Sequence, residues 1–313
     1  MSATAELAPG ELVRPGKPQE ISDRTRHERK LGWMLSAPAV IVMLFVTAYP
    51  MLQALYLSLF SYRLTDPAGK RFVGLSNYYI ILKDSIFWQD VAVTAIITAV
   101  TVVVELIIGF GFALVMHRIV VAKGPVRTAI LVPYGAITVV SAFAWKYAFE
   151  LDSGFVNKWL HLGTFDWFAH TWSALLVICL SEIWKTTPFI ALLLLAGLAQ
   201  VPEVLNEAAA VDGATAWQRL RKVTIPNMKA AIMVAVLFRT LAAWAIFDNI
   251  FIMTGGSANT ESISFLTYRQ SITRVEVGLG SALSVVLFLS VVLIAFVFVK
   301  GFKVNLGAVR ADR

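Results

Sequence analysis

The chain has 313 residues, of which 58% are hydrophobic and 15% are charged, and its formal net charge is +7. This composition is too apolar and too poor in charge for a soluble globular protein. The single cysteine, Cys179, excludes an internal disulfide and most cysteine-based metal sites.

The N-terminal part of the chain begins with a polar stretch and continues into an apolar one. Residues 1–30 contain prolines and become basic towards their end, which predicts a flexible cytoplasmic tail. No charged residue occurs between Lys30 and Arg63. This run is too long for the core of a signal peptide and has no small-residue cleavage site after it, so we expect a retained anchor.

Five further apolar runs follow the first one. They cover about residues 91–116, 128–145, 171–199, 230–253 and 277–299. A helix needs roughly 20 apolar residues to cross a bilayer. The sequence therefore predicts an all-α polytopic membrane protein with six transmembrane helices in one membrane domain, residues 31–303, followed by a cytoplasmic C-terminal tail, residues 304–313.

The distribution of the bases predicts the orientation of these spans. With the N-terminus in the cytoplasm, 17 of the 27 lysines and arginines fall in cytoplasmic segments and 8 fall outside. Cytoplasmic loops of membrane proteins carry the excess of Lys and Arg, so both termini are predicted to be cytoplasmic. The positive charge thus reflects topology, and we expect no nucleic-acid partner.

Four charged residues lie near the middle of predicted spans: Glu105, Glu182, Lys185 and Arg239. Each costs about 2.5–3.5 kcal/mol at the centre of a membrane helix, so we expect these side chains to face the interior of the bundle. Glu182 and Lys185 are three residues apart and share one helix face, so they can also pair with each other. The four residues predict an interior network that either braces the bundle or contacts substrate.

The fifth predicted span combines aromatic and polar side chains. Trp244 and Asp248 are four residues apart and would share one helix face, with Asn249 beside them and Arg239 on nearly the opposite side. Such a pairing suits a sugar, whose C–H groups lie against aromatic rings while its hydroxyls need polar partners. The other candidates for the substrate pathway are Trp145, Tyr147, Trp184, Lys185 and Phe189. Each aromatic residue taken singly also suits a membrane interface or a packed core.

Two prolines, Pro133 and Pro188, lie inside predicted spans. Proline removes a backbone hydrogen bond and can kink a helix, and such breaks often lie near transport pathways. For Pro133 a packing kink is the preferred interpretation.

A polar segment, residues 207–226, separates the fourth and fifth predicted spans. The small residues Ala208 and Ala209 allow a partner surface to approach closely, and Asp212-Gly213 predicts a helix stop, because glycine tolerates the left-handed conformation. The bases Arg219, Arg221 and Lys222 follow. A short helix that stops, turns and restarts could contact a cytoplasmic partner, and an ordinary capped loop is the alternative.

Signatures of catalysis are missing from the sequence. There is no G-x-x-x-x-G-K-[ST] phosphate loop and no serine nucleophile elbow, and the four histidines are scattered over the tail and loops. We therefore expect no catalytic residue, no metal site and no cofactor in this chain.

The polar segment resembles the EAA loop of permease subunits of bacterial ATP-driven (ABC-type) importers. The resemblance rests on Glu207-Ala208-Ala209, Asp212-Gly213-Ala214 and Ile225-Pro226. Further motifs that match the carbohydrate permeases of this family are Phe72-Val73-Gly74-Leu75, Asn77-Tyr78, Pro188-Phe189, Ala196-Gly197-Leu198 and Thr254-Gly255-Gly256. The chain departs from the family pattern at Leu220, Ala230 and Ser257-Ala258.

This resemblance implies the type I ABC importer permease (MetI-like) fold, with alternating access driven by partner ATPases. It places a coupling helix within about residues 200–229 and implies that Glu207, Ala208, Ala209, Asp212, Gly213 and Ala214 couple to the ATPase. The implied partners are a second permease, two subunits that bind ATP and Mg²⁺, and an extracytoplasmic sugar-binding (lipo)protein at the bacterial plasma membrane. Residues 182–197 and 238–256 are most similar to trehalose permeases, which implies a disaccharide such as trehalose.

Two other classes of function stay open from the residues alone. A secondary transporter could use Glu105, Glu182 and Asp248 as proton or ion relays without an ATPase. A membrane-embedded enzyme acting on lipid-linked sugars could use Asp212, although no further acids cluster near it. Dependence on a proton gradient without ATP would indicate the first class, and turnover by the purified chain alone would indicate the second.

Overall fold

The computed structural model of the chain describes residues 23–119 and 123–301. The predicted C-terminal tail, residues 304–313, and residues 1–22 of the predicted N-terminal tail lie outside the described residues. The chain divides into two compact units, Met1–Gln53 and Ala54–Arg313, and each unit is described by itself.

The described part of the first unit is helical and belongs to α1 (Asp23–Leu57). Because α1 begins at Asp23, the last residues of the predicted tail are helical. The candidate span Lys30–Leu57 lies in this helix, and none of the residues in its most apolar part is buried within the chain. Exposed apolar side chains along a span of this length suit contact with lipid or with another subunit.

The second unit begins at Ala54 with the last turn of α1 and continues with a hairpin of two antiparallel strands, β1 (Phe60–Arg63) and β2 (Asp66–Phe72), which was not predicted from the sequence. The next helices are α2 (Ser76–Lys83), α3 (Ser85–Arg118), α4 (Lys123–Gly135), α5 (Thr138–Phe149), α6 (Phe155–Leu160) and α7 (Thr171–Leu198). Asp84 fixes the start of α3, because its carboxylate accepts a hydrogen bond from the backbone N–H of Ile86 (2.9 Å).

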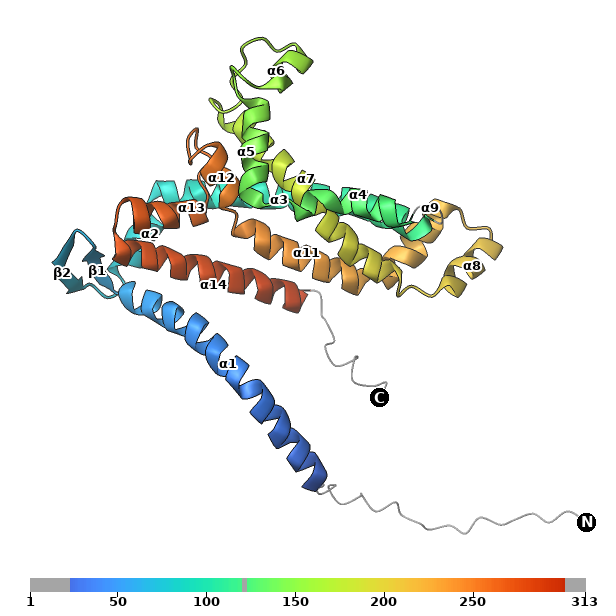
Figure 1. Cartoon of the computed structure of the whole chain (residues 1–313), viewed down its shortest axis with the longest axis horizontal. Helices are drawn as coiled ribbons and strands as arrows, with labels where there is room; N and C mark the ends of the chain where they lie inside the picture. Colours follow the sequence, from blue (N-terminus) through green and yellow to red (C-terminus); the bar gives the residue numbers. More distant parts are fainter. Residues whose placement is uncertain (1–22, 120–122, 302–313) are drawn as a thin grey trace, which may run out of the picture. The chain divides into compact units, whose positions relative to one another are not determined.

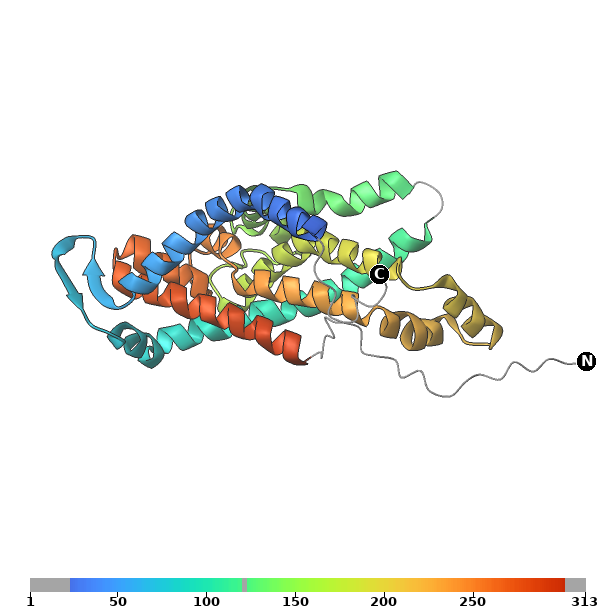
Figure 2. The same cartoon turned by 90° about the horizontal axis from the view of Figure 1, so that it is seen from below.

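The C-terminal half of this unit continues with shorter elements and one long helix. They are α8 (Glu203–Val211), α9 (Ala216–Arg219), the π-helical η1 (Leu220–Thr224), α10 (Ile225–Asn227), α11 (Lys229–Trp244), α12 (Asp248–Met253), α13 (Ile263–Tyr268), the π-helical η2 (Arg269–Thr273) and α14 (Val277–Gly301). The hairpin and α2 lie at one end of α3 and α14, and α8 and α9 lie at the opposite end of the unit (Figure 1). Figure 2 shows the same separation from below.

Five segments of the described chain are long and apolar enough to cross a membrane, or six if α4 and α5 count as one span. They agree with the predicted runs except at the third, where α4 and α5 are bent by 87° instead of forming one continuous helix. Pro133 lies in the last turn of α4, Gly135 ends it, and Ile137 adopts an extended conformation before α5 begins. Proline and glycine both weaken a helix, which explains why the span breaks here.

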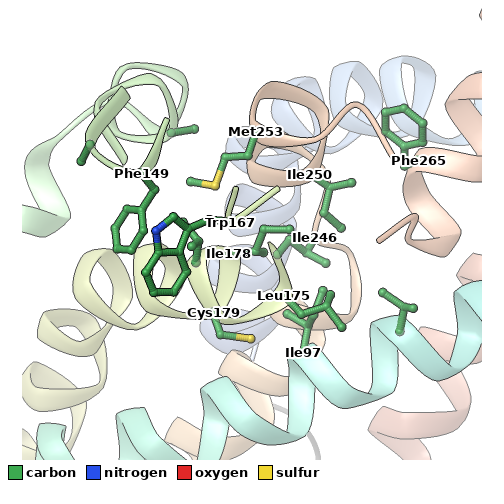
Figure 3. Packing of buried hydrophobic residues seen from close by; sticks show 14 residues of the cluster. Ile97, Phe149, Trp167, Leu175, Ile178, Cys179, Ile246, Ile250, Met253 and Phe265 are labelled. Carbon is green, nitrogen blue, oxygen red and sulfur yellow. The ribbon is translucent and has the colours of Figure 1, made fainter. Parts of the chain in front are cut away.

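Packing within the second unit is centred on α3 and α7. Figure 3 shows the largest apolar cluster, in which Ile97 of α3, Ile178 of α7 and Ile250 of α12 lie close together. Cys179 is buried in this cluster as a free thiol. Gly109 of α3 faces α7, because a Cβ atom added to Gly109 would lie 2.8 Å from Cγ2 of Ile190. Small residues at such contacts let two membrane helices approach closely.

We therefore predict that Gly109→Leu disrupts the contact between α3 and α7. The leucine would overpack this contact, at a cost of about 1–3 kcal/mol, and should lower the unfolding midpoint of the purified chain in detergent. Gly111→Leu on the same helix is the matched control, because a Cβ at Gly111 meets no atom within 4 Å. Equal midpoints for the two variants would contradict this account of the packing.

Candidate functional site

Three buried charges meet where α3, α7 and α11 pack together. Arg239 of α11 is 4% exposed, Glu105 of α3 is 0% exposed and Glu182 of α7 is 8% exposed. The guanidinium group donates two hydrogen bonds to Glu105, from Nε to Oε2 and from Nη2 to Oε1 (2.9 Å), and Nη2 also donates to Oε2 of Glu182 (2.8 Å). A bidentate pair of this kind is both strong and directional. One arginine thus joins three helices.

The carboxylate oxygens of this cluster are all hydrogen-bonded. Oγ1 of Thr186 donates to Oε1 of Glu105 (2.7 Å), and Nδ2 of Asn249 donates to Oε1 of Glu182 (2.6 Å). Together with Arg239, these groups provide each of the four oxygens with a donor, as buried charges require. Asn249, a predicted substrate contact, is 1% exposed and therefore serves this cluster in the structure.

Lys185, the fourth predicted member of the network, takes a different partner. Its ammonium group donates a hydrogen bond to Oγ1 of Thr138, the first residue of α5. The ion pairs of the described residues do not include the predicted local pair between Glu182 and Lys185. The physical reason is that Arg239 and Asn249 already occupy the carboxylate of Glu182.

A polar cavity of about 380 Å³ lies beside the charge cluster. Its polar lining consists of Thr138, Glu182, Lys185, Thr186 and Asp248. The cavity thus offers hydroxyl groups, carboxylates and an ammonium group within one space, which suits a ligand rich in hydroxyls. The described residues contain no group of three or more His, Cys, Asp or Glu side chains that could hold a metal ion.

Two helix breaks border this cavity. One is the bend before Thr138, and the other is the interruption between α11 and α12, from which Ala245, Ile246 and Phe247 line the cavity. At a break, backbone N–H and C=O groups lack helical partners, which is tolerated at membrane depth only inside protein or beside a cavity. Broken helices are a common way to build the binding sites of transporters.

The predicted pairing of Trp244 with Asp248 is wrong, because α11 ends at Trp244 and a new helix starts at Asp248. The indole of Trp244 donates a hydrogen bond to Oγ of Ser290 on α14 (2.8 Å), and Trp244 does not line the cavity. Asp248 does line it, as the first residue of α12.

The other aromatic candidates also lie outside the lining of this cavity. Trp145 stacks on Phe149, and Trp184 lines a separate, apolar cavity of about 500 Å³ together with both predicted kink residues, Pro133 and Pro188. Phe189 stacks on Tyr134 with 5.6 Å between ring centroids, and Tyr147 is 59% exposed. Of the predicted pathway residues, the described chain therefore brings Lys185 and Asp248 to one cavity.

Sequence reasoning missed a second buried charge cluster. Glu261 pairs with Arg269 (2.7 Å), and Asp90 of α3 lies near enough to interact with both charges. Burial raises the pKa of Glu261, while the charge of Arg269 opposes this rise. The available signal was Asp90 itself, an acid close to the start of a predicted span. Thr138 was also missed, since a single threonine in an apolar run carries no signal.

The segment between α7 and α11 folds as a helix, a turn and a second helix. Asp212 is the C-terminal cap of α8, and Gly213 follows with a φ of +78°, which lets Ala214 N–H donate to the carbonyl of Ala209 (2.9 Å). Thr215 then starts α9 with a capping box formed with Gln218. The predicted stop, turn and restart are present.

The surface of this segment is largely uncovered in the chain. Glu207 and Ala208 are exposed and Ala209 is half-buried. Three apolar side chains nearby are also exposed: Val204 (70%), Val211 (88%) and Trp217 (66%). Exposed apolar side chains grouped on a polar segment are typical of a surface that another protein covers.

Comparison with known proteins gives consistent results for most of the chain. A family model described as "Binding-protein-dependent transport system inner membrane component" matches residues 33–303. The trehalose transport system permease protein SugA of Mycobacterium tuberculosis is 50% identical over 88% of this chain and 89% of that protein. The trehalose/maltose transport system permease protein MalF of Thermococcus litoralis is 35% identical over 87% of this chain and 94% of that protein.

Solved structures also match, at the level of the fold. A bacterial ABC transporter involved in the import of the acidic polysaccharide alginate has a TM-score of 0.77 at 19% identity, covering 91% of this chain and 100% of that chain. The MetNI methionine ABC transporter has a TM-score of 0.53 at 16% identity, covering 71% of this chain and 98% of that chain.

The buried charge cluster leads to a prediction about stability. Arg239→Leu would leave two carboxylates buried without a counter-charge, which should cost about 3–5 kcal/mol and lower the unfolding midpoint of the purified chain in detergent. Lys185→Leu is the matched control, since it removes a half-buried base and only one hydrogen bond, at about 1 kcal/mol. A larger loss for Lys185→Leu than for Arg239→Leu would contradict the geometry.

Proposed function

Because this chain belongs to the family of binding-protein-dependent transport system inner membrane components, and is thus an ABC-type permease subunit, we propose that it carries a sugar, with trehalose as the first candidate. The observation behind this proposal is the 50% identity to a trehalose permease over 88% of the chain. The subunit is not an enzyme itself, because ATP hydrolysis in such transporters belongs to the partner ATPase. Family membership also argues against the secondary-transporter and lipid-linked-sugar alternatives.

The proposed assembly contains this chain, a second permease, two ATP-binding subunits that hold ATP and Mg²⁺, and an extracytoplasmic sugar-binding (lipo)protein. The excess of bases on one side of the predicted spans supports a cytoplasmic location for both termini and for the segment of residues 200–229. We refer to this segment as the coupling segment. Its exposed apolar side chains support docking of an ATPase. The residues proposed for this contact are Glu207, Ala208, Ala209, Asp212, Gly213 and Ala214.

The polar cavity between the two helix breaks is the proposed place of substrate passage in this chain. Lys185 provides a positively charged hydrogen-bond donor, Asp248 provides an acceptor, and Thr138 provides a hydroxyl group. Together these groups can replace water around sugar hydroxyls. Glu182 belongs both to this cavity and to the charge cluster. Six other predicted pathway residues do not line this cavity in the chain by itself. They would support the pathway by packing around it or would contact substrate together with the second permease: Trp145, Tyr147, Trp184, Phe189, Trp244 and Asn249.

Isolation of the tagged chain from native membranes tests this proposal. We expect an ATPase, a second six-span protein and a secreted sugar-binding protein to copurify, and we expect trehalose to stimulate ATP hydrolysis by the complex. Lys185→Leu should leave the complex assembled while abolishing the stimulation, since only the cavity changes. A chain that emerges alone from a preparation shown to preserve membrane complexes would contradict the proposed assembly. If another sugar stimulates ATP hydrolysis and trehalose does not, that sugar is the substrate in place of trehalose.

The turn at Gly213 gives a prediction about coupling. Gly213→Val places a β-branched side chain at a φ of +78°, which costs about 1–3 kcal/mol and should alter the turn. We expect normal membrane insertion with loss of trehalose-stimulated ATP hydrolysis and uptake. Gly163→Val is the matched control, because Gly163 also has a positive φ (+62°) with no atom within 4 Å of its Cβ position, far from this segment in sequence. Normal uptake with Gly213→Val would refute a coupling role for the turn.

A further inference from the structure

A further cavity lies apart from the polar cavity of the membrane core. It has a volume of about 550 Å³ and lies between the last turn of α3, the connection from α7 to α8, and α9 with η1. One wall therefore belongs to the membrane helices, and the other belongs to the coupling segment. A ligand in this space would contact both walls at once.

The lining of this cavity contains more basic than acidic side chains, beside the neutral polar residues Gln200, Asn206 and Thr224. Arg118 and His117 come from the last turn of α3, and Arg219 comes from the end of α9. Among the described residues, neither arginine forms an ion pair, and Glu203 is the acid in the lining. Arginine groups from two elements that face one cavity suit an anion with several oxygen acceptors, such as a phosphate group.

The start of α8 adds to this positive potential. Pro202 precedes the helix and provides no side-chain cap, so the first backbone N–H groups of α8 have no side-chain acceptor from that residue. α8 has nine residues, and both Pro202 and Glu203 line the cavity. A helix N-terminus favours negative charge by its dipole, in addition to the two arginines.

The remaining lining is apolar and lies at the ends of two candidate spans. Leu114, Leu198 and Leu220 form part of the wall. The candidate span of α3 ends at Arg118, and that of α7 ends at Leu198. Spans end at the level of the lipid headgroups, so a phosphate beside the arginines would lie where phospholipids carry theirs. Basic pockets between membrane helices on the cytoplasmic side bind acidic headgroups.

We propose that this cavity binds the phosphate headgroup of an anionic phospholipid of the cytoplasmic leaflet and that the lipid holds the coupling segment against α3. The cytoplasmic side follows from the proposed function. The glycerol backbone of the lipid contacts the leucine wall, and its phosphate lies between Arg118, Arg219 and the start of α8. The lipid thereby stabilises the position from which the coupling segment meets the ATPase.

The test uses the complete transporter in nanodiscs that contain phosphatidylcholine and phosphatidylglycerol. Native mass spectrometry measures how many phosphatidylglycerol molecules stay bound. With about a fivefold contribution from each base at a membrane surface, Arg118→Gln with Arg219→Gln should weaken this retention about 30-fold. Arg221→Gln with Lys222→Gln is the matched control, because it removes the same charge from exposed positions outside the cavity lining and should leave retention unchanged.

Equal retention by the wild type, the cavity variant and the control would overturn the proposal. Should the cavity variant fail to assemble, a photoreactive phosphatidylglycerol applied to the wild-type complex decides the question, since crosslinks must include Leu114–Arg118 or Gln200–Glu203 peptides. Crosslinks confined to other surfaces would overturn it. Glycerol phosphate added to the nanodiscs that contain phosphatidylglycerol tests a soluble source of the phosphate group, and complete displacement of the bound phosphatidylglycerol by this anion would overturn the lipid assignment.

The same preparations keep this proposal separate from the proposed function. Trehalose-stimulated ATP hydrolysis by the wild type, together with unchanged lipid retention in the cavity variant, rejects the lipid site alone. Absence of sugar stimulation in every lipid mixture, together with selective lipid retention, rejects the proposed sugar function and leaves the lipid site in place.

Discussion

The pairing of charges in a medium of low polarity is the constraint on which the core of this protein depends. A bilayer does not solvate a carboxylate or a guanidinium group, so each must find its partners within the bundle. Arg239 meets this requirement for Glu105 and Glu182 together, and Thr186 and Asn249 supply the remaining donors. Since these groups come from α3, α7, α11 and α12, one cluster determines how four helices lie against each other.

The same constraint explains why the helix breaks lie where they do. Unpaired backbone groups at membrane depth require either protein or a polar cavity beside them. The break before Thr138 and the break after Trp244 both border the polar cavity, and Glu182 is shared between this cavity and the charge cluster. A ligand that attracts Lys185 or Asp248 would therefore act on groups directly connected to the packing of the core.

The helix α11 connects the two regions to which we assign a function. It begins at Lys229, the last residue of the coupling segment, carries Arg239 in the charge cluster, and ends at the break that lines the cavity. A movement of the coupling segment along α11 would thus reach the cavity through one continuous helix. The buried ion pairs resist sliding of α11 against α3 and α7, because a displaced guanidinium would leave carboxylates without donors.

Much of this protein could be predicted from the sequence, because the signals concerned are local. The apolar runs, the stop and turn at Gly213, and the motifs that resemble the permease family depend on neighbouring residues, and the family model confirms the family. The intramembrane charges could also be selected from the sequence, since each is conspicuous in an apolar run. Their burial follows from the cost of a charge in lipid.

Only the tertiary structure decided which of these residues meet. The sequence places Glu182 next to Lys185 and Trp244 next to Asp248, yet Glu182 binds Arg239, and the helix breaks between Trp244 and Asp248. The bend between α4 and α5 brings Thr138 to Lys185, and Glu261 pairs with Arg269 beside Asp90. Periodicity assumes a continuous helix and sees only one helix at a time. The partners here lie on different helices, so the pattern along one helix does not predict which of them meet.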